Sequence, residues 1–301
     1  MATEDNITTC ANCGKGEEST GDLKACTACK LVKYCSRECQ IAHRPLHKKA
    51  CKKRSAELHD DALFKEHPPL DCPICLLPLP LQANEIEFKS FCGKVICHGC
   101  ICAMSEEARG RGKICLCAFC REPNPTSEED EVKRTKKLVE AKNAHAIFVL
   151  GGWHDHGDVV PQDHRMANEL YLRAGELGCA DAYCNLGNSY LIGEGVEVDM
   201  KKAKHYYELA AMKGDFDARR DLGCMEGRAG NHHRAIKHFI LAARDRHSNS
   251  LEKVKAGFMS GIVTKDEYAN TLRAYRRAQD EMKSDDRDKA AARGVHENVT
   301  H

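Results

Sequence analysis

The sequence predicts a multidomain chain in which two small zinc-stabilised modules precede an all-α solenoid of helical hairpins. Its 301 residues suffice for two or three domains. Of its 19 cysteines, 16 lie at or before residue 120, mostly in closely spaced pairs. From residue 143 onward, Ala, Leu and Gly recur with a spacing of 36 residues, which is typical of stacked helical repeats.

The first module, over residues 10–54, contains eight potential metal ligands within 42 residues. They are Cys10, Cys13, Cys26, Cys29, Cys35, Cys39, His47 and Cys51. A Cys-x2-Cys pair wraps a tight turn around one ion, and two ligands four residues apart share one helix face. Eight such ligands make two closed tetrahedral zinc sites, without the open position that catalysis needs. A segment of about 45 residues cannot bury enough apolar surface to fold unaided, so we expect zinc to stabilise it.

This ligand pattern, with Tyr34 directly before Cys35, resembles a MYND-type zinc finger. The resemblance implies a cross-brace with two zinc ions. One ion would be held by Cys10, Cys13, Cys35 and Cys39, and the other by Cys26, Cys29, His47 and Cys51. MYND relatives generally bind short, often proline-containing peptides, so the resemblance implies protein or peptide partners.

The first module is also basic, with 11 Lys and Arg against 4 Asp and Glu. Five of these cations, Lys48, Lys49, Lys52, Lys53 and Arg54, cluster around the last ligand. One interpretation is a nucleic-acid or nuclear-import patch. The other is a solvated helix end whose cations meet the helix dipole. No aromatic residues interleave with the cations for base stacking, so nucleic acid is kept as the weaker alternative.

A second cysteine cluster, over residues 71–125, resembles a RING finger with a degenerate three-cysteine, histidine, four-cysteine pattern. Its core ligands are Cys72, Cys75, Cys92, Cys97, Cys100, Cys117 and Cys120. The resemblance implies one zinc on Cys72, Cys75, Cys97 and Cys100, and a second on the other three cysteines. The usual eighth ligand is a histidine, but Lys94 occupies that position. Cys115, Cys102 and His98, in that order, are candidates to replace it, or the second site is weak or empty.

Two further residues of this cluster suit a ubiquitin-ligase RING by the same resemblance. Ile74 lies where such domains present an apolar contact to the ubiquitin-conjugating enzyme. Arg121 directly follows the last cysteine, where a cation can hydrogen-bond the conjugating enzyme and ubiquitin. A RING has no nucleophile of its own and works by orienting a loaded thioester. The alternative interpretations are a packing residue for Ile74 and a surface charge for Arg121.

The helical part, over residues 143–279, is an internal repeat. Three Leu-Gly pairs begin at Leu150, Leu186 and Leu222, and each lies four residues after an alanine. Asp163, Asp199 and Asn231 are placed to cap a second helix of each unit, and Gly178 and Gly214 to end it. The pattern resembles Sel1-type repeats, relatives of tetratricopeptide repeats. A fourth, degenerate unit keeps Val254 and Phe258 in register and is expected to cap the stack.

The remaining segments are expected to be non-globular. We expect disorder over 1–9, a charged linker over 55–70, a charged linker helix over 126–142 and a mobile charged tail over 280–301. The first five residues carry no apolar leader, and no run of about 18 apolar residues occurs. The sequence therefore predicts neither a secreted nor a membrane protein, and paired thiols indicate zinc in the reducing cytoplasm or nucleus.

The preferred hypothesis is a zinc-binding protein-interaction adaptor that uses the MYND-type finger and the repeat surface. The alternative is a RING-type ubiquitin ligase that recruits a conjugating enzyme, with substrate held by the other segments. No catalytic nucleophile and no cofactor other than zinc are predicted. The histidines around Asp155 (His154 and His156) lack metal spacing and are expected to be solvated or packed between helices.

Overall fold

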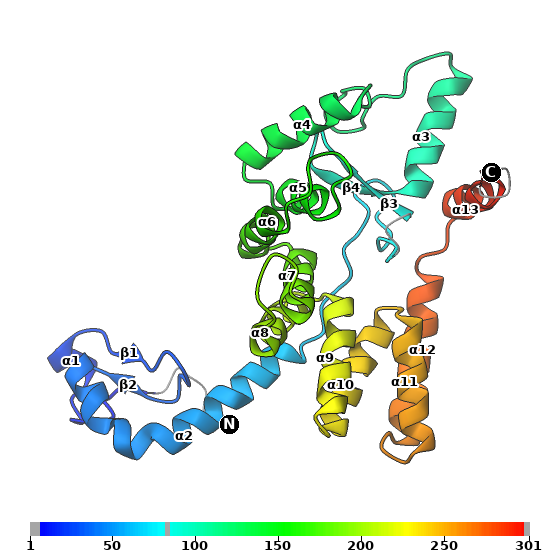
Figure 1. Cartoon of the computed structure of the whole chain (residues 1–301). Coiled ribbons are helices and arrows are strands. Elements are labelled where there is room, and N and C mark those ends of the chain that lie inside the picture. The colour runs from blue at the N-terminus through cyan, green and yellow to red at the C-terminus, as the bar shows by residue number, and fades with distance from the viewer. Residues whose placement is uncertain (1–6, 82–84, 298–301) are drawn as a thin grey trace. The chain divides into compact units, whose positions relative to one another are not determined.

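The structure, a computed structural model, describes residues 7–81 and 85–297 (Figure 1). Its contacts divide the chain into two compact units that meet in the sequence at Lys65 and Glu66. Of the segment expected to be disordered, residues 1–6 lie outside the described residues, and Thr9 forms a β-bridge with Gly16. No helix in the described ranges is long and apolar enough to cross a membrane.

The first unit contains the first cysteine module. It is built from α1 (Glu17–Thr20), an antiparallel pair of short strands, β1 (Lys24–Ala25) and β2 (Lys33–Tyr34), and the long helix α2 (Arg37–Leu63). Ser36 caps α2 by accepting a hydrogen bond from the amide of Cys39. The linker expected over 55–70 is therefore helical as far as Leu63. Its sequence contains good helix formers, and nothing between Arg54 and Leu63 interrupts the intrahelical hydrogen bonds.

The second unit begins with the second cysteine module. An antiparallel hairpin of β3 (Ile86–Lys89) and β4 (Lys94–Cys97) leads directly into α3 (His98–Gly110). Ile86 pairs with Cys97 and Lys89 with Lys94, so Cys97 lies where strand changes to helix. Ile96 is buried against the cysteines around it.

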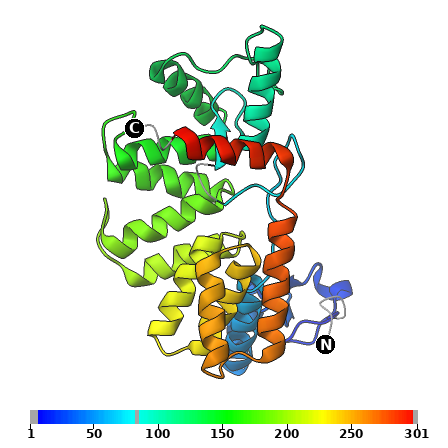
Figure 2. The same ribbon diagram turned by 90° about the vertical axis from the view of Figure 1, so that its right-hand side faces the viewer.

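Nine further helices follow α3 as far as α12. They are α4 (Glu128–Glu140), α5 (Ala144–His156), α6 (His164–Glu176), α7 (Ala180–Ile192), α8 (Met200–Ala211), α9 (Phe216–Arg228), α10 (His232–Arg244), α11 (Ser248–Met259) and α12 (Lys265–Asp280). From α4 to α12 each helix packs on the next, and α10 also contacts α12. Figure 2 shows the resulting stack of antiparallel hairpins, as expected for a solenoid.

Each of the three repeats contains one close contact between a glycine and an aromatic ring. A Cβ added to Gly151, Gly187 or Gly223 would lie 2.6–2.9 Å from the ring atoms of Tyr171, Tyr207 or Phe239, respectively. Both tyrosines are fully buried. The Leu-Gly pairs of the sequence therefore mark the positions where the first helix of a hairpin meets the aromatic residue of the second.

The helix caps agree with those predicted from the sequence in two repeats and differ from the prediction in the third. Asp163 and Asp199 accept hydrogen bonds from the first-turn amides of α6 and α8. Asn231 occupies the corresponding position before α10, but its side chain forms no cap. The side-chain amide of Asn231 instead donates a 2.7 Å hydrogen bond to the carboxylate of Glu226. This buried carboxylate also accepts a hydrogen bond from Lys204. The need to pair that buried carboxylate explains why the expected cap is absent.

The prediction of a mobile tail over 280–301 is wrong for most of that segment. Residues Asp285–Glu297 form α13, which packs against α3, and Ala290 is only 4% exposed. Both views show α13 beside the amino-terminal end of α3 (Figures 1 and 2). The contacts that hold α13 against α3 are largely polar. The sequence of α13 therefore does not show the apolar periodicity by which a packed helix is usually recognised. Residues 298–301 lie outside the described residues.

The close glycine contact predicts opposite effects for two neighbouring substitutions in α5. Gly151→Ala should lower the free energy of unfolding by about 1–3 kcal/mol, because the new Cβ overpacks the buried ring of Tyr171. Gly152→Ala is the matched control, since its Cβ would approach no closer than 4.0 Å to the Tyr171 hydroxyl. It should be neutral or stabilise by up to about 1 kcal/mol through helix propensity. Urea unfolding of both variants measures the difference, and equal stabilities would contradict the proposed packing.

Candidate metal centres

Four of the five Cys-x2-Cys pairs of the chain form turns with one backbone geometry, and the fifth pair, Cys97 and Cys100, lies where β4 leads into α3. In each turn the carbonyl of the first cysteine accepts a hydrogen bond of 2.9–3.1 Å from the amide of the residue after the second cysteine. That residue has a positive φ of 57–72° in every case. These residues are Gly14, Lys30, Leu76 and Arg121. Strand pairs or β-bridges close each turn from outside, as between Asp71 and Pro78 or Leu116 and Pro123. The geometry turns both sulfur atoms toward the same point.

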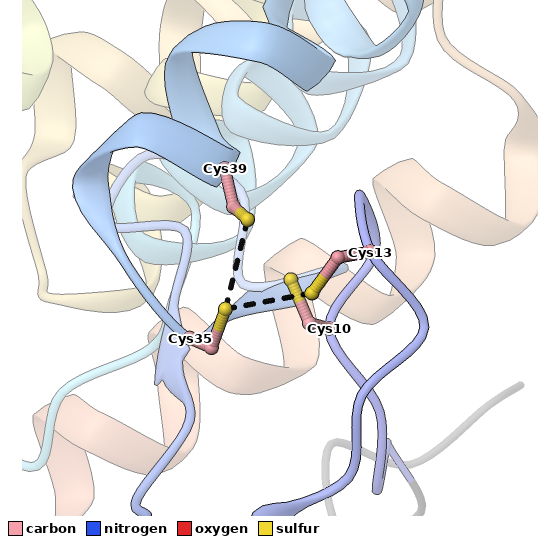
Figure 3. A group of neighbouring side chains, drawn as sticks. All are labelled: Cys10, Cys13, Cys35 and Cys39. Atoms are coloured by element: carbon pink, nitrogen blue, oxygen red, sulfur yellow. Dashed lines mark hydrogen bonds between the residues drawn. The ribbon is translucent and has the colours of Figure 1, made fainter. Parts of the chain in front are cut away.

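The first group of ligand atoms consists of Cys10, Cys13, Cys35 and Cys39, whose sulfur atoms all lie within 4.8 Å of one another (Figure 3). Cys13 and Cys39 are 3.6 Å from Cys35. The first turn of α2 brings Cys39 back over Cys35. The amide of Cys13 is the largest cause that lowers the pKa of the Cys10 thiol to about 6, which favours the thiolate form that a metal needs.

The second group consists of Cys26, Cys29, His47 and Cys51. Its distances are 3.1 Å from Cys29 Sγ to His47 Nε2 and 3.8 Å between the sulfur atoms of Cys26 and Cys51. His47 and Cys51 are one turn apart on α2 and present their ligand atoms on one face. Tyr34 packs its ring beside His47, and its hydroxyl lies 3.1 Å from His43 Nδ1. The first unit thus interleaves its groups, since alternate ligand pairs along the chain share a site.

The third group lies in the second cysteine module and consists of Cys72, Cys75, Cys97 and Cys100. The sulfur atoms of Cys72 and Cys100 are 3.9 Å apart, and those of Cys75 and Cys97 are 3.8 Å apart. The amide of Cys97 also donates to Cys72 Sγ over 3.5 Å. The turn at 72–75 therefore meets the end of β4 and the start of α3, and Cys72, Cys97 and Cys100 are buried.

The fourth group contains three cysteines, Cys92, Cys117 and Cys120, with 3.7 Å between the sulfur atoms of Cys92 and Cys117. Within residues 7–81 and 85–297, no other Cys, His, Asp or Glu ligand atom joins this group. Lys94, at the start of β4, is exposed.

The three candidate replacement ligands lie elsewhere. Cys115 accepts a hydrogen bond from Ser105 over 3.8 Å. His98 is exposed at the beginning of α3, and Cys102 is half-buried farther along the same helix. None of the three belongs to the group of Cys92.

The four groups suit zinc. Two thiolates on a tetrahedral zinc ion with Zn–S bonds of about 2.3 Å are about 3.8 Å apart. The sulfur–sulfur distances of 3.6–3.9 Å in these groups agree with that separation. None of the cysteines forms a disulfide in the structure. The first three groups offer four ligands each, so a bound ion would have no position left for substrate, and its contribution would be to folding.

The two residues considered for a conjugating-enzyme contact have structural roles as well. Ile74 is half-buried and packs against the cluster of Cys72, Ile96 and Cys97. Arg121 has a φ of 63° and closes the 117–120 turn through its amide, while its side chain is exposed.

Sequence reasoning missed two features of the second unit. Arg287 of α13 donates a hydrogen bond to Cys75 Sγ, and nothing in the local sequence signals a contact 212 residues away. The other feature is a cluster of Asp155, His164 and Glu194. There the Asp155 carboxylate accepts from the Tyr171 hydroxyl over 3.2 Å and lies 2.9 Å from His164 Nδ1. These contacts join the end of α5 to α6, and they give the Asp155 carboxylate protein partners without a metal ion.

Known proteins resemble separate parts of the chain. The sequence profile of the MYND finger matches residues 10–51, and that of the Sel1 repeat matches residues 144–179, 180–215 and 217–247. An uncharacterized protein of Neisseria meningitidis serogroup B is 38% identical over 86 residues. That match covers 29% of this chain and 18% of the relative, so the chain spans less than a fifth of the relative's length.

Solved structures resemble about half of the chain. A Sel1 repeat protein from Oxalobacter formigenes is 26% identical, with a TM-score of 0.45, and the match covers 52% of this chain and 67% of that one. A protective antigen of uropathogenic Escherichia coli that displays an SLR fold is 23% identical, with a TM-score of 0.46, over 52% of this chain and 35% of the antigen. From the sequence profiles, the chain carries a MYND finger near its amino-terminal end and three Sel1 repeats in its helical part.

Proposed function

We propose that the protein is a zinc-dependent adaptor that binds protein or peptide partners through its MYND finger and its Sel1 repeat surface. The proposed modules are the MYND finger over 10–54, the RING-like finger over 71–125 and the repeats over 143–279. The fifteen proposed ligands are the members of the four converging groups. Paired free thiols support a reducing location, in the cytoplasm or nucleus. Two binding modules on one chain raise each other's effective concentration once one partner is held.

Four exposed apolar residues at and near the turn between α7 and α8, named here the α7–α8 patch, carry this proposal. The α7–α8 patch consists of Met166, Ile192, Val198 and Met200, which are 41%, 59%, 61% and 48% exposed. Two backbone contacts hold its turn in place. A Cβ on Gly195 would lie 2.5 Å from the backbone of His164, and Asn168 donates to the Glu194 carbonyl over 2.7 Å. A fixed turn that presents apolar side chains is suited to binding a protein segment.

Selection of a displayed random peptide library against the full chain tests the adaptor. Ile192→Glu should weaken the best binder by about 30-fold or more, because a charge replaces a central apolar contact. Leu177→Glu is the matched control. Leu177 is 44% exposed and caps the other end of α6, 11 residues after Met166 and therefore about 16 Å along the helix. Equal affinity of the two variants, or no enriched peptide, would count against the repeat surface as the binding site.

A ubiquitin-ligase function is the second candidate, and the arrangement of the second cysteine module favours it. The cysteine pairs at 72–75 and 97–100 converge, while Cys92 joins the pair at 117–120, so the groups interleave as in a cross-braced finger. Such a module would orient a loaded conjugating enzyme without supplying a nucleophile.

Autoubiquitination with a panel of conjugating enzymes tests this second candidate. Arg121→Ala should abolish the signal, because the exposed guanidinium is lost while the amide that closes the turn remains. Ile74→Ala is less informative, since Ile74 also packs in the module's core. Absence of signal from the unaltered chain with every conjugating enzyme would count against the ligase and favour the adaptor.

Nucleic-acid binding through Lys48, Lys49, Lys52 and Lys53 is a separate and weaker alternative, and it requires affinity that falls steeply with salt.

The three-cysteine group predicts that one zinc ion is held less tightly than the others. Lys94→His should increase the chelator resistance of that ion, because Lys94 begins β4 two residues after Cys92 and its backbone amide hydrogen-bonds that thiol. Native mass spectrometry of the full chain at rising chelator concentration counts the ions that remain. Lys94→Gln, which adds no suitable ligand, should behave like the unaltered chain. Four equally resistant ions in the unaltered chain would show that another group completes the site.

A further inference from the structure

The carboxy-terminal helix α13 contacts the third cysteine group through one arginine. Arg287 Nη2 donates to Cys75 Sγ over 3.4 Å and to the Leu77 carbonyl over 3.4 Å. Its Nη1 donates to the Pro78 carbonyl over 2.8 Å and to the Met282 carbonyl over 3.2 Å. The guanidinium therefore joins a thiol of the proposed metal site to the backbone of the turn that carries it.

The backbone of α13 is seated as closely as its arginine. A Cβ added to Gly99 at the start of α3 would lie 2.8–3.0 Å from the Cγ, N and Cα atoms of Arg287. Ser284 accepts the Arg287 amide over 3.3 Å, so the first turn of α13 is capped at this contact. Arg293 forms an ion pair with Glu106 farther along the two helices. The close approach to Gly99 and the cap at Ser284 hold the start of α13, and with it the guanidinium, beside Cys75.

The charge of the site explains why a cation belongs there. Four thiolates around one Zn²⁺ carry a formal charge of about −2, and three of these four cysteines are buried. Hydrogen bonds from outside the ligand set stabilise such charge and orient the ligands. A guanidinium provides both effects, because it is permanently charged and its planar donors reach several acceptors at once.

We propose that Arg287 is an outer-shell cation of the Cys72, Cys75, Cys97 and Cys100 site, and that α13 thereby retains the metal of the second cysteine module. This proposal rests on the metal ligands proposed above. It adds a role for the carboxy-terminal helix, which links the end of the chain to a metal site more than 200 residues earlier in the sequence.

Zinc release from the full chain tests the proposal. Native mass spectrometry first counts the zinc ions bound to the unaltered protein, and release into a chromogenic chelator is then followed in time. The phase that belongs to this site is the one lost in Cys72→Ser. Arg287→Gln should accelerate that phase by about 10–100-fold, the usual effect of removing an outer-shell partner. Arg287→Lys should lie between Arg287→Gln and the unaltered chain, because it keeps the charge but not the fork of donors.

Arg293→Gln is the matched control, since it removes a cation from the same helix without touching a thiol, and it should leave the phase within about twofold of the unaltered rate. Gly99→Ala, which leaves the arginine in the sequence but displaces the helix, should accelerate release. If Arg287→Gln fails to fold, the release rate of Gly99→Ala still tests the role of α13. Unchanged release in Arg287→Gln and Gly99→Ala overturns the role of Arg287. Absence of zinc from this site in the unaltered chain overturns the ligand assignment itself, which is a separate result.

Discussion

The cysteine modules depend on one local backbone geometry, the Cys-x2-Cys turn. Each turn needs a residue with positive φ directly after its second cysteine, and three of the four turns use a residue other than glycine there. Such residues adopt this conformation at some cost in free energy. In the two clusters of buried residues that define these modules, more than half of the members are cysteines. The modules thus have little apolar core apart from their ligands, and metal binding is the interaction that can offset the cost of the turns.

The helical part solves the same problem of small size in a different way. A single hairpin buries too little apolar surface, so each one shares its faces with its neighbours. Close approach of the two helices requires a residue without a side chain opposite a large ring. Gly151 against Tyr171, Gly187 against Tyr207 and Gly223 against Phe239 meet that requirement in turn. Packing of this kind needs no metal, so the repeats and the fingers draw their stability from independent sources.

The second cysteine module combines both kinds of stabilisation. Its ligands converge as in the first module, yet α13 also packs on its helix and hydrogen-bonds the carbonyls of its first turn. Arg246, just after α10, likewise donates to the Leu79 carbonyl over 2.8 Å. Two arginines from distant parts of the chain, one in α13 and one just after α10, therefore hold the backbone around residues 77–79. This polar anchoring places the module within the same compact unit as the repeats.

Spacing along the chain is enough to predict the features that depend on short-range order. Ligand pairs, Leu-Gly positions and aspartate caps recur at fixed intervals because turns and helices impose those intervals, and the order of a finger region and a solenoid follows from them. The remaining features depend on the folded structure. It brings Cys92, Cys117 and Cys120 into one group of three, pairs Asn231 with Glu226 instead of capping α10, and folds a charged tail as α13. Arg287 shows the reason. Its partners are a thiol and backbone carbonyls far away in the chain, and a carbonyl has no residue identity that a sequence pattern can reveal.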